Sequence, residues 1–287
     1  MRDWMNDRFG RGRTITREAV VQTPLRLELH TSHGRVSVRG IEGTSAIVRA
    51  EIDFKGFHRD DGGQAEEMVV AGIVFEGDRL RIESPAEGRD SLNVHYEVSV
   101  PFATLANLTV LNGPIELIGI EGPVDVTLTN GPLVIEGIHS AVELELTNGP
   151  AHVQRCRGPV DAKVANGPIH IEDVAGPLDV TVNNGPISIE DVSAGIKASA
   201  INGPVTYRGA VGGNFDMRST HGGIVLELPG DSRFELDAEA ERGDVYCDFD
   251  VKDQTGAPSG GQVPRIVLRS ERGEIVVQQT TRAGASR

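Results

Sequence analysis

The chain has 287 residues and carries 28 Lys and Arg against 42 Asp and Glu, which gives a formal net charge of −14. Only 4% of the residues are aromatic while 38% are hydrophobic, so the core must be built from Val, Ile and Leu, which favour strands. The acidic balance argues against nucleic acid as a partner. No apolar run approaches the ~20 residues needed to span a bilayer, so we expect no integral membrane segment.

The N-terminal residues 1–16 predict a disordered tail, because they hold four Arg and two Asp without any hydrophobic periodicity. They contain no apolar stretch of the kind found in a signal peptide. With no spanning segment either, the sequence predicts a cytoplasmic protein. Its two cysteines, Cys156 and Cys247, are too few for a disulfide framework.

Residues 17–111 are expected to form N-terminal, degenerate coils of a repeat protein. Apolar residues alternate with polar ones at Leu25, Leu27 and Leu29, and again between Ala46 and Phe54, as in strands. The segment at about 64–71, QAEEMVVA, is the one plausible helix, and we expect it to cover an open end of the fold.

Residues 112–219 contain a regular repeat of 18 residues, which is typical of a repeat architecture. Each unit begins with Asn-Gly-Pro, and the asparagines of these turns are Asn112, Asn130, Asn148, Asn166, Asn184 and Asn202. A second turn, often Gly-Pro, follows nine residues after the first Gly-Pro, so each unit predicts two short strands and two tight turns.

Apolar and polar residues alternate within each predicted strand, as where Ile115 and Leu117 flank Glu116. This period of two places one face inward and the other in solvent. The apolar columns recur from unit to unit, which predicts an all-β, parallel β-solenoid with coils about 4.7–4.9 Å apart. A left-handed hexapeptide helix would also fit 18 residues, but the apolar positions repeat at two and nine rather than at six.

Residues 220–280 are expected to form C-terminal coils with insertions. Related turns occur at His221-Gly222, Arg242-Gly243 and Arg272-Gly273, and the segment 252–261 is expected to be a loop extruded from one coil. Residues 281–287 predict a second disordered tail. Arg242-Gly243-Asp244 spells the tripeptide read by integrins, but its alignment with the Arg272 turn explains it more simply.

The leader Val98–Pro101 and the following segment from Leu108 to Ile115, succeeded by Asn-Gly coils in register, resemble the bacterial "putative adhesin" domain of unknown function. The resemblance covers roughly residues 20–280. It implies a β-solenoid without assigned catalytic residues and an association with the cell envelope or with envelope stress. A looser resemblance is to bactofilins, whose β-helices polymerise end to end.

The six turn asparagines are interpreted as a structural ladder, because stacked amides can hydrogen bond from coil to coil. A second column is acidic and is a candidate interaction surface; its members are Asp125, Glu143, Asp161 and Asp179. In a polysaccharide-active enzyme, paired carboxylates could act as acid and base. The regular spacing of this row is instead typical of a solvated stripe, so no catalytic residue is assigned.

His152 and His170 are expected to stack about 5 Å apart on one outward face, with Glu172 on the same face as His170. A metal site needs more converging ligands than a flat strand face provides, so neither a metal nor a cofactor is predicted. Cys156 and Cys247 lie in inward columns and are interpreted as core residues.

These patterns predict a non-catalytic scaffold or binding protein whose partner is a protein or an envelope component. A self-assembling structural protein, forming homo-oligomers through its terminal coils, is the alternative, because an end coil has unpaired backbone groups. A polysaccharide-active β-helix enzyme is a third hypothesis.

Overall fold

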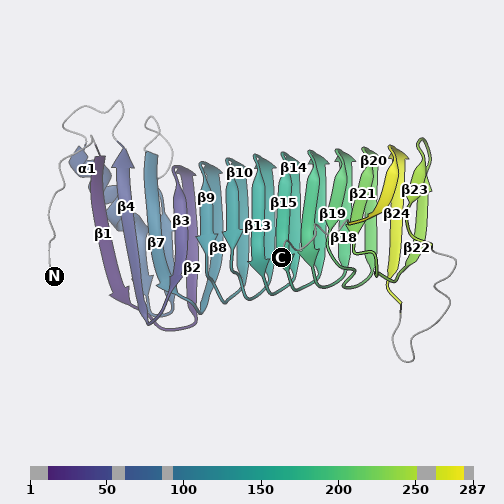
Figure 1. The fold of residues 1–287 in the computed structure, drawn as a ribbon. Coiled ribbons are helices and arrows are strands. Elements are labelled where there is room, and N and C mark those ends of the chain that lie inside the picture. Colours follow the sequence, from purple (N-terminus) through teal and green to yellow (C-terminus); the bar gives the residue numbers. More distant parts are fainter. Residues whose placement is uncertain (1–11, 54–61, 86–92, 251–262, 281–287) are drawn as a thin grey trace, which may run out of the picture. The chain divides into compact units, whose positions relative to one another are not determined.

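The computed structural model describes residues 12–53, 62–85, 93–250 and 263–280. The chain forms two compact units, residues 1–132 and 133–287. The expected loop at 252–261, the tail at 281–287 and most of the expected N-terminal tail lie outside the described residues. Both units consist mainly of strands (Figure 1).

The first unit contains one helix and ten strands within its described residues. They are β1 (Gly12–Val20), β2 (Leu25–His33), β3 (Val36–Ile41), β4 (Ser45–Asp53), α1 (Gly62–Gly72), β5 (Ile73–Glu76), β6 (Arg79–Glu83), β7 (Asn93–Pro101), β8 (Thr104–Asn112), β9 (Ile115–Ile118) and β10 (Val124–Asn130). Within this unit one sheet has the order β1-β4-β7-β3-β9 and the other has the order β10-β8-β2-β6-β5. The expected short helix is confirmed as α1.

The start of the first unit corrects the expected disorder at residues 12–16. These residues belong to β1, which pairs antiparallel with β4 along its whole length. The sequence did not indicate this strand because its apolar alternation is interrupted. The charged Arg17 lies between Ile15 and Ala19 on the face where an apolar residue is expected. The Arg17 guanidinium donates a hydrogen bond to the Val70 carbonyl of α1 at 3.1 Å, so this half-buried group has a polar partner.

The N-terminal coils do not stack in chain order. The strand β2 lies between β6 and β8, and β3 lies between β7 and β9. Antiparallel pairs join β1 to β4, β4 to β7 and β5 to β6, whereas the other pairs of this unit are parallel. The helix α1 contacts β1, β5 and β6 and buries Val69 completely.

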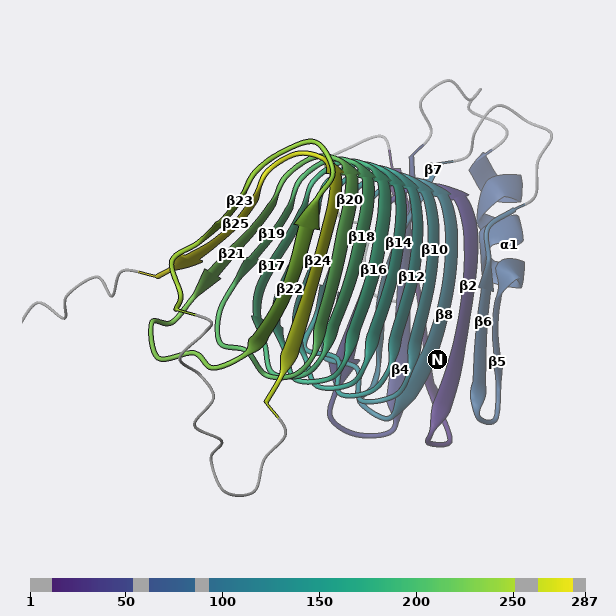
Figure 2. The ribbon, with the colours of Figure 1, turned by 90° about the vertical axis from the view of Figure 1, so that its right-hand side faces the viewer.

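The second unit contains fifteen strands within its described residues. They are β11 (Leu133–Glu136), β12 (Val142–Asn148), β13 (Ala151–Cys156), β14 (Val160–Asn166), β15 (Ile169–Val174), β16 (Leu178–Asn184), β17 (Ile187–Val192), β18 (Ile196–Asn202), β19 (Val205–Arg208), β20 (Phe215–His221), β21 (Ile224–Leu228), β22 (Glu235–Ala240), β23 (Val245–Cys247), β24 (Arg265–Arg272) and β25 (Ile275–Gln279). Odd-numbered strands from β11 to β21 form one parallel sheet and even-numbered strands from β12 to β20 form the other (Figure 2).

The core of the second unit follows the alternation of the sequence. The inward column that begins at Ile135 is almost inaccessible to solvent; its next members are Val153, Ile171, Ile189 and Tyr207. The outward residues of the same strands, such as Glu172, are exposed or half-buried. The parallel β-solenoid predicted from the 18-residue period is confirmed.

The C-terminal coils are out of chain order, which corrects the expected sequential stacking. The last coil, β24 and β25, lies between the coil of β20 and β21 and the coil of β22 and β23 (Figures 1 and 2). Thus β24 pairs with β20 on one side and with β22 on the other, all in parallel. The coil of β22 and β23 is therefore the outermost one, although the chain reaches it first.

Candidate binding surface

The turn asparagines form hydrogen-bonded ladders in each unit. In the second unit, each side-chain amide donates to the side-chain oxygen of the preceding coil, with Nδ2–Oδ1 distances of 2.9, 2.8 and 2.8 Å along Asn148, Asn166, Asn184 and Asn202. In the first unit Asn130 donates to Asn112 at 2.9 Å. These side chains therefore connect coils to each other, and each interior amide is occupied by its neighbours.

The glycine of each Asn-Gly-Pro turn adopts a backbone conformation that side-chain-bearing residues rarely adopt. Gly167 has a φ of 141°, and a Cβ atom built on it would lie 1.9 Å from the carbonyl oxygen of Gly149 in the preceding coil. The turn thus requires glycine both for its dihedral angle and for the close approach of two backbones.

Three members of the predicted acidic row lie on successive strands of the second unit. Glu143 on β12 is in register with Asp161 on β14, which is in register with Asp179 on β16. The row ends at Lys197, whose ammonium group lies 2.7 Å from the Asp179 carboxylate. Asp125 belongs to the first unit, where it lies beside Asn107 of β8.

The lysine in the outward column next to the acidic row pairs within its own column. Lys163 lies beside Glu145, with an N–O distance of 3.5 Å, rather than relieving Asp161 two residues away. Glu143 and Asp161 are both exposed and have no ion-pair partner among the described residues. They face solvent as like charges on adjacent strands.

The predicted histidine pair lies on the other sheet. The rings of His152 and His170 stack with centroids 4.9 Å apart and an interplanar angle of 16°. The nearest carboxylate oxygen of Glu172 lies 3.9 Å from His170 Nε2. Within the described residues, no three His, Cys, Asp or Glu side chains gather in a way that could hold a metal ion.

The two cysteines differ in their surroundings. Cys156 is buried as expected, and burial raises the pKa of its thiol to about 11. Cys247 is only half-buried, which corrects its assignment to the core: it lies on β23 in the outermost coil, where one side has no neighbouring coil among the described strands. Cys247 is in register with the buried Val277, so it does belong to an inward column, but the sequence did not show that its coil is the outermost one.

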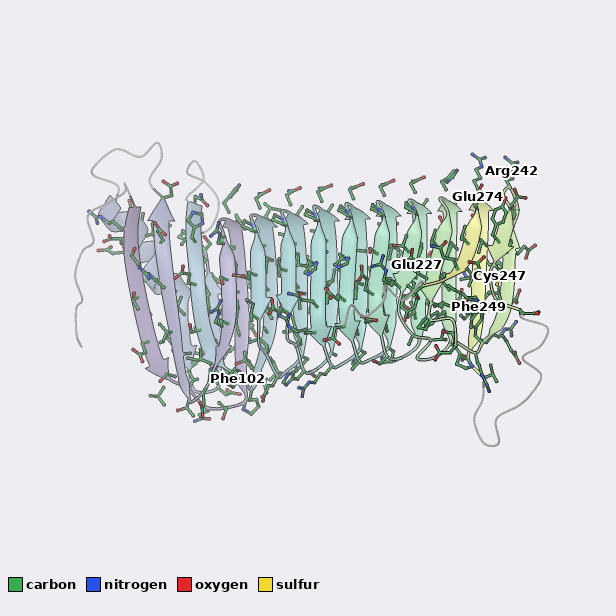
Figure 3. All side chains as sticks on the ribbon, viewed as in Figure 1. Phe102, Glu227, Arg242, Cys247, Phe249 and Glu274 are labelled. Carbon is green, nitrogen blue, oxygen red and sulfur yellow. The ribbon has the colours of Figure 1, made fainter. Side chains whose placement is uncertain are left out.

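The Arg242-Gly243-Asp244 turn is exposed at the end of β22, at the same tip as Glu274 (Figure 3). The backbone N–H of Gly273 donates to the Arg242 carbonyl at 3.3 Å, so the two turns lie on adjacent coils as their alignment predicted. Sequence reasoning missed that β23, in the outermost coil beside this turn, has exposed side chains. Val245 and Tyr246 of β23 are 42% and 52% exposed.

Comparison with protein-family models and with curated proteins gives no match. Solved bacterial structures match along most of the chain at low identity. One, described as a "putative lipid binding protein" from Parabacteroides distasonis ATCC 8503, is 14% identical over 95% of this chain and 98% of that one, with a TM-score of 0.48. A "putative adhesin" from Parabacteroides merdae ATCC 43184 is 11% identical over 95% and 98%, with a TM-score of 0.47. A "putative cell adhesion protein" from Clostridium sporogenes ATCC 15579 is 11% identical over 93% and 100%, with a TM-score of 0.26.

No helix within the described ranges is long and apolar enough to cross a membrane.

Proposed function

We propose that this protein is a non-catalytic β-solenoid scaffold that binds a protein or an envelope component through the outward surfaces of its coils. One observation carries the proposal: the inward columns of the second unit are filled with buried, mostly aliphatic side chains, while the outward residues of the same strands are exposed or half-buried and lie in register. Rows of side chains at a fixed spacing can recognise a partner along several coils at once.

The acidic row supports a binding function better than a catalytic one. Hydrolysis of a glycosidic bond by two carboxylates requires that their environments differ, so that one is protonated and the other ionised. Glu143 and Asp161 are both exposed and lie in the same outward column. An association with the bacterial cell envelope is part of the proposal and rests on the resemblance of the Asn-Gly coils.

Photo-crosslinking from the two sheet faces tests this function. A photoreactive amino acid is placed at Thr181, which is exposed on β16, or at Ser188, which is half-buried on the outward face of β17. We expect a discrete adduct with a cellular component from at least one face, and competition by excess unlabelled protein. Adducts from neither face, or cleavage of a glycan by the purified protein, would contradict the proposal.

The alternative of a self-assembling structural protein is favoured by the exposure of the outermost coil, in particular of Val245 at 42%. Sedimentation across a range of protein concentrations distinguishes the two functions. A mass that grows with concentration supports assembly, whereas a constant mass supports a scaffold for other partners.

A further inference from the structure

The outermost coil of the second unit leaves core positions uncovered. Leu236 and Ala238 on β22 are half-buried, although Ile266 and Leu268, their register partners on β24, are 0% exposed. Val245 on β23 is 42% exposed, although its partner Ile275 is 0% exposed. The difference arises because β24 and β25 have a coil on both sides, whereas β22 and β23 have one only on the inner side within the described residues.

The strand β22 also has an edge with no backbone partner among the described strands. The N–H groups of Glu235 and Glu241 donate to carbonyls of the adjoining coil, at Pro264 and Ser270. In a parallel strand, successive residues direct their N–H and C=O groups to opposite sides. The groups of Leu236, Ala238 and Ala240 therefore point to the outer edge of β22, where the sheet order ends.

The side chains along this edge are acidic. Four carboxylates lie on the outward face of β22 and just after it: Glu235, Asp237, Glu239 and Glu241. Asp237 pairs with Arg265 and Arg269 of β24, at 2.9 and 2.8 Å, and Glu239 lies 3.6 Å from Arg269. Glu235 and Glu241 are exposed and have no ion pair with any described residue.

The first unit also ends in strands with a single partner in the described sheets, β1 and β5, but a helix lies against them. There α1 contacts β1, β5 and β6, and it buries Ala65 and Val69. Arg13 of β1 pairs with Glu66 of the helix at 2.9 Å. A helix of this kind is a usual way of protecting the end of a sheet.

We propose that the outer edge of β22 and β23 binds an extended basic peptide strand by β-strand addition. The free backbone groups would supply hydrogen bonds, and the half-buried Leu236 and Ala238 would receive apolar side chains. Lys or Arg side chains of the peptide would face Glu235 and Glu241, which gives charge complementarity. This inference goes beyond the proposed binding through the outward surfaces: it adds a site at the end of the second unit and names the chemistry of its partner.

The same charges oppose the pairing of two such edges from two copies of the chain, because like charges on adjacent strands repel. The segments 251–262 and 281–287, which follow β23 and β25 in the chain, contain no Leu, Ile, Met, Phe, Tyr or Trp. In these two segments Val251 is the one branched aliphatic residue, so their composition is poor in side chains that bury apolar area. A partner strand with both basic and apolar residues satisfies both features of the edge.

The test measures binding of two synthetic peptides to the full chain by fluorescence anisotropy. One peptide alternates Lys and Val over seven residues, and the other alternates Glu and Val. We expect the basic peptide to bind at low salt, to weaken as salt is raised, and to slow amide exchange at Leu236, Ala238 and Ala240. The acidic peptide should not bind.

A double variant, Glu235→Lys with Glu241→Lys, should weaken binding of the basic peptide at least tenfold. The matched control is Glu172→Lys with Glu190→Lys, which makes the same change of net charge on β15 and β17, whose edges are both paired. Binding to the control should change less than twofold. A thermal melt of each variant shows that it remains folded.

Three results would overturn the inference: equal binding of both peptides or of neither, equal weakening in the control, or concentration-dependent dimers that the edge variant abolishes. Photo-crosslinking with the edge variant separates this failure from that of the proposed function. If the variant still forms the adducts of the wild type at Thr181 or Ser188, the binding function stands and its site lies elsewhere.

Discussion

Ile171 shows how the alternation of apolar and polar residues contributes to the stability of the fold. Ile171 on β15 is 0% exposed, and its neighbour Glu172 is exposed on the opposite face. Replacing Ile171 with Asp would bury a charge among aliphatic side chains and should lower the free energy of unfolding by about 3–5 kcal/mol. Glu172→Lys should change it by less than about 0.5 kcal/mol. Urea denaturation measures both, and equal losses would contradict the inward and outward assignment.

The turn glycine Gly167 should tolerate no side chain. Gly167→Val introduces a β-branched residue at a φ of 141° and places its Cβ against the Gly149 carbonyl oxygen. We expect a loss of at least about 2 kcal/mol, because both the dihedral angle and the contact are unfavourable. The control is Gly63→Ala in α1, where a Cβ meets nothing within 4 Å and the substitution should be neutral or stabilising. A Gly167→Val protein that melts like the wild type would show that the turn has another geometry.

The acidic row contains residues with opposite expected effects on stability. Glu143→Gln with Asp161→Asn removes a repulsion between adjacent strands, so the thermal midpoint should rise by about 1–2 °C at low salt. Asp179→Asn removes the pair with Lys197 and should lower the midpoint by a similar amount. Both shifts should shrink in high salt, because exposed charges are screened.

Calorimetry of the wild type and these two variants in low and high salt measures the shifts. A lower midpoint for the Glu143 and Asp161 variant would mean that these carboxylates are paired or bind a cation. Either result would contradict their description as a solvated stripe.

At the scale of strands, the sequence predicts which residues of a coil face inward but not which coils are neighbours. Leu236 and Ile266 fit the same inward column, so either strand could pack against β20. The periodicity of the sequence does not encode which of the two strands packs there. The same reasoning explains why the position of β2 between β6 and β8 escaped prediction.

The candidate sites also include features that the sequence predicts and features that only the structure shows. The stacking of His152 on His170 and the register of Glu143 with Asp161 follow from the 18-residue period alone. The contact of Lys163 with Glu145 required the structure, because the side chain can reach either of two nearby carboxylates. The open edge of β22 depends on the order of the coils, so it could not be found in the sequence.

The order of the last coils can be tested with engineered disulfides. His221 is in register with Arg272 on the adjacent strand, so His221→Cys with Arg272→Cys should form a disulfide on mild oxidation. His221→Cys with Arg242→Cys should not, because the coil of β24 and β25 separates these positions and a disulfide cannot bridge Cα atoms more than about 7 Å apart. Peptide mapping identifies the product. Efficient crosslinking of residues 221 and 242 would mean that the coils stack in chain order.

At the scale of the second unit, stability depends on neighbouring coils. Each coil contacts only the coils beside it, so an interior coil is held from two sides and an end coil from one. Unfolding is therefore expected to begin at β22 and β23, whose inward residues are already partly exposed, and to reach β15 last. Stability is therefore expected to fall from the interior coils to the outermost coil of the second unit.

Hydrogen–deuterium exchange of the full chain measures this gradient most directly. We predict slow exchange throughout β13 to β18, where every strand is paired on both sides, and fast exchange at Leu236, Ala238 and Ala240 on the free edge of β22. Exchange at β24 should be slower than at β22, although β24 lies nearer the C-terminus of the chain. Equal protection of β22 and β15, or faster exchange at β24 than at β22, would contradict a solenoid whose outermost coil is left open.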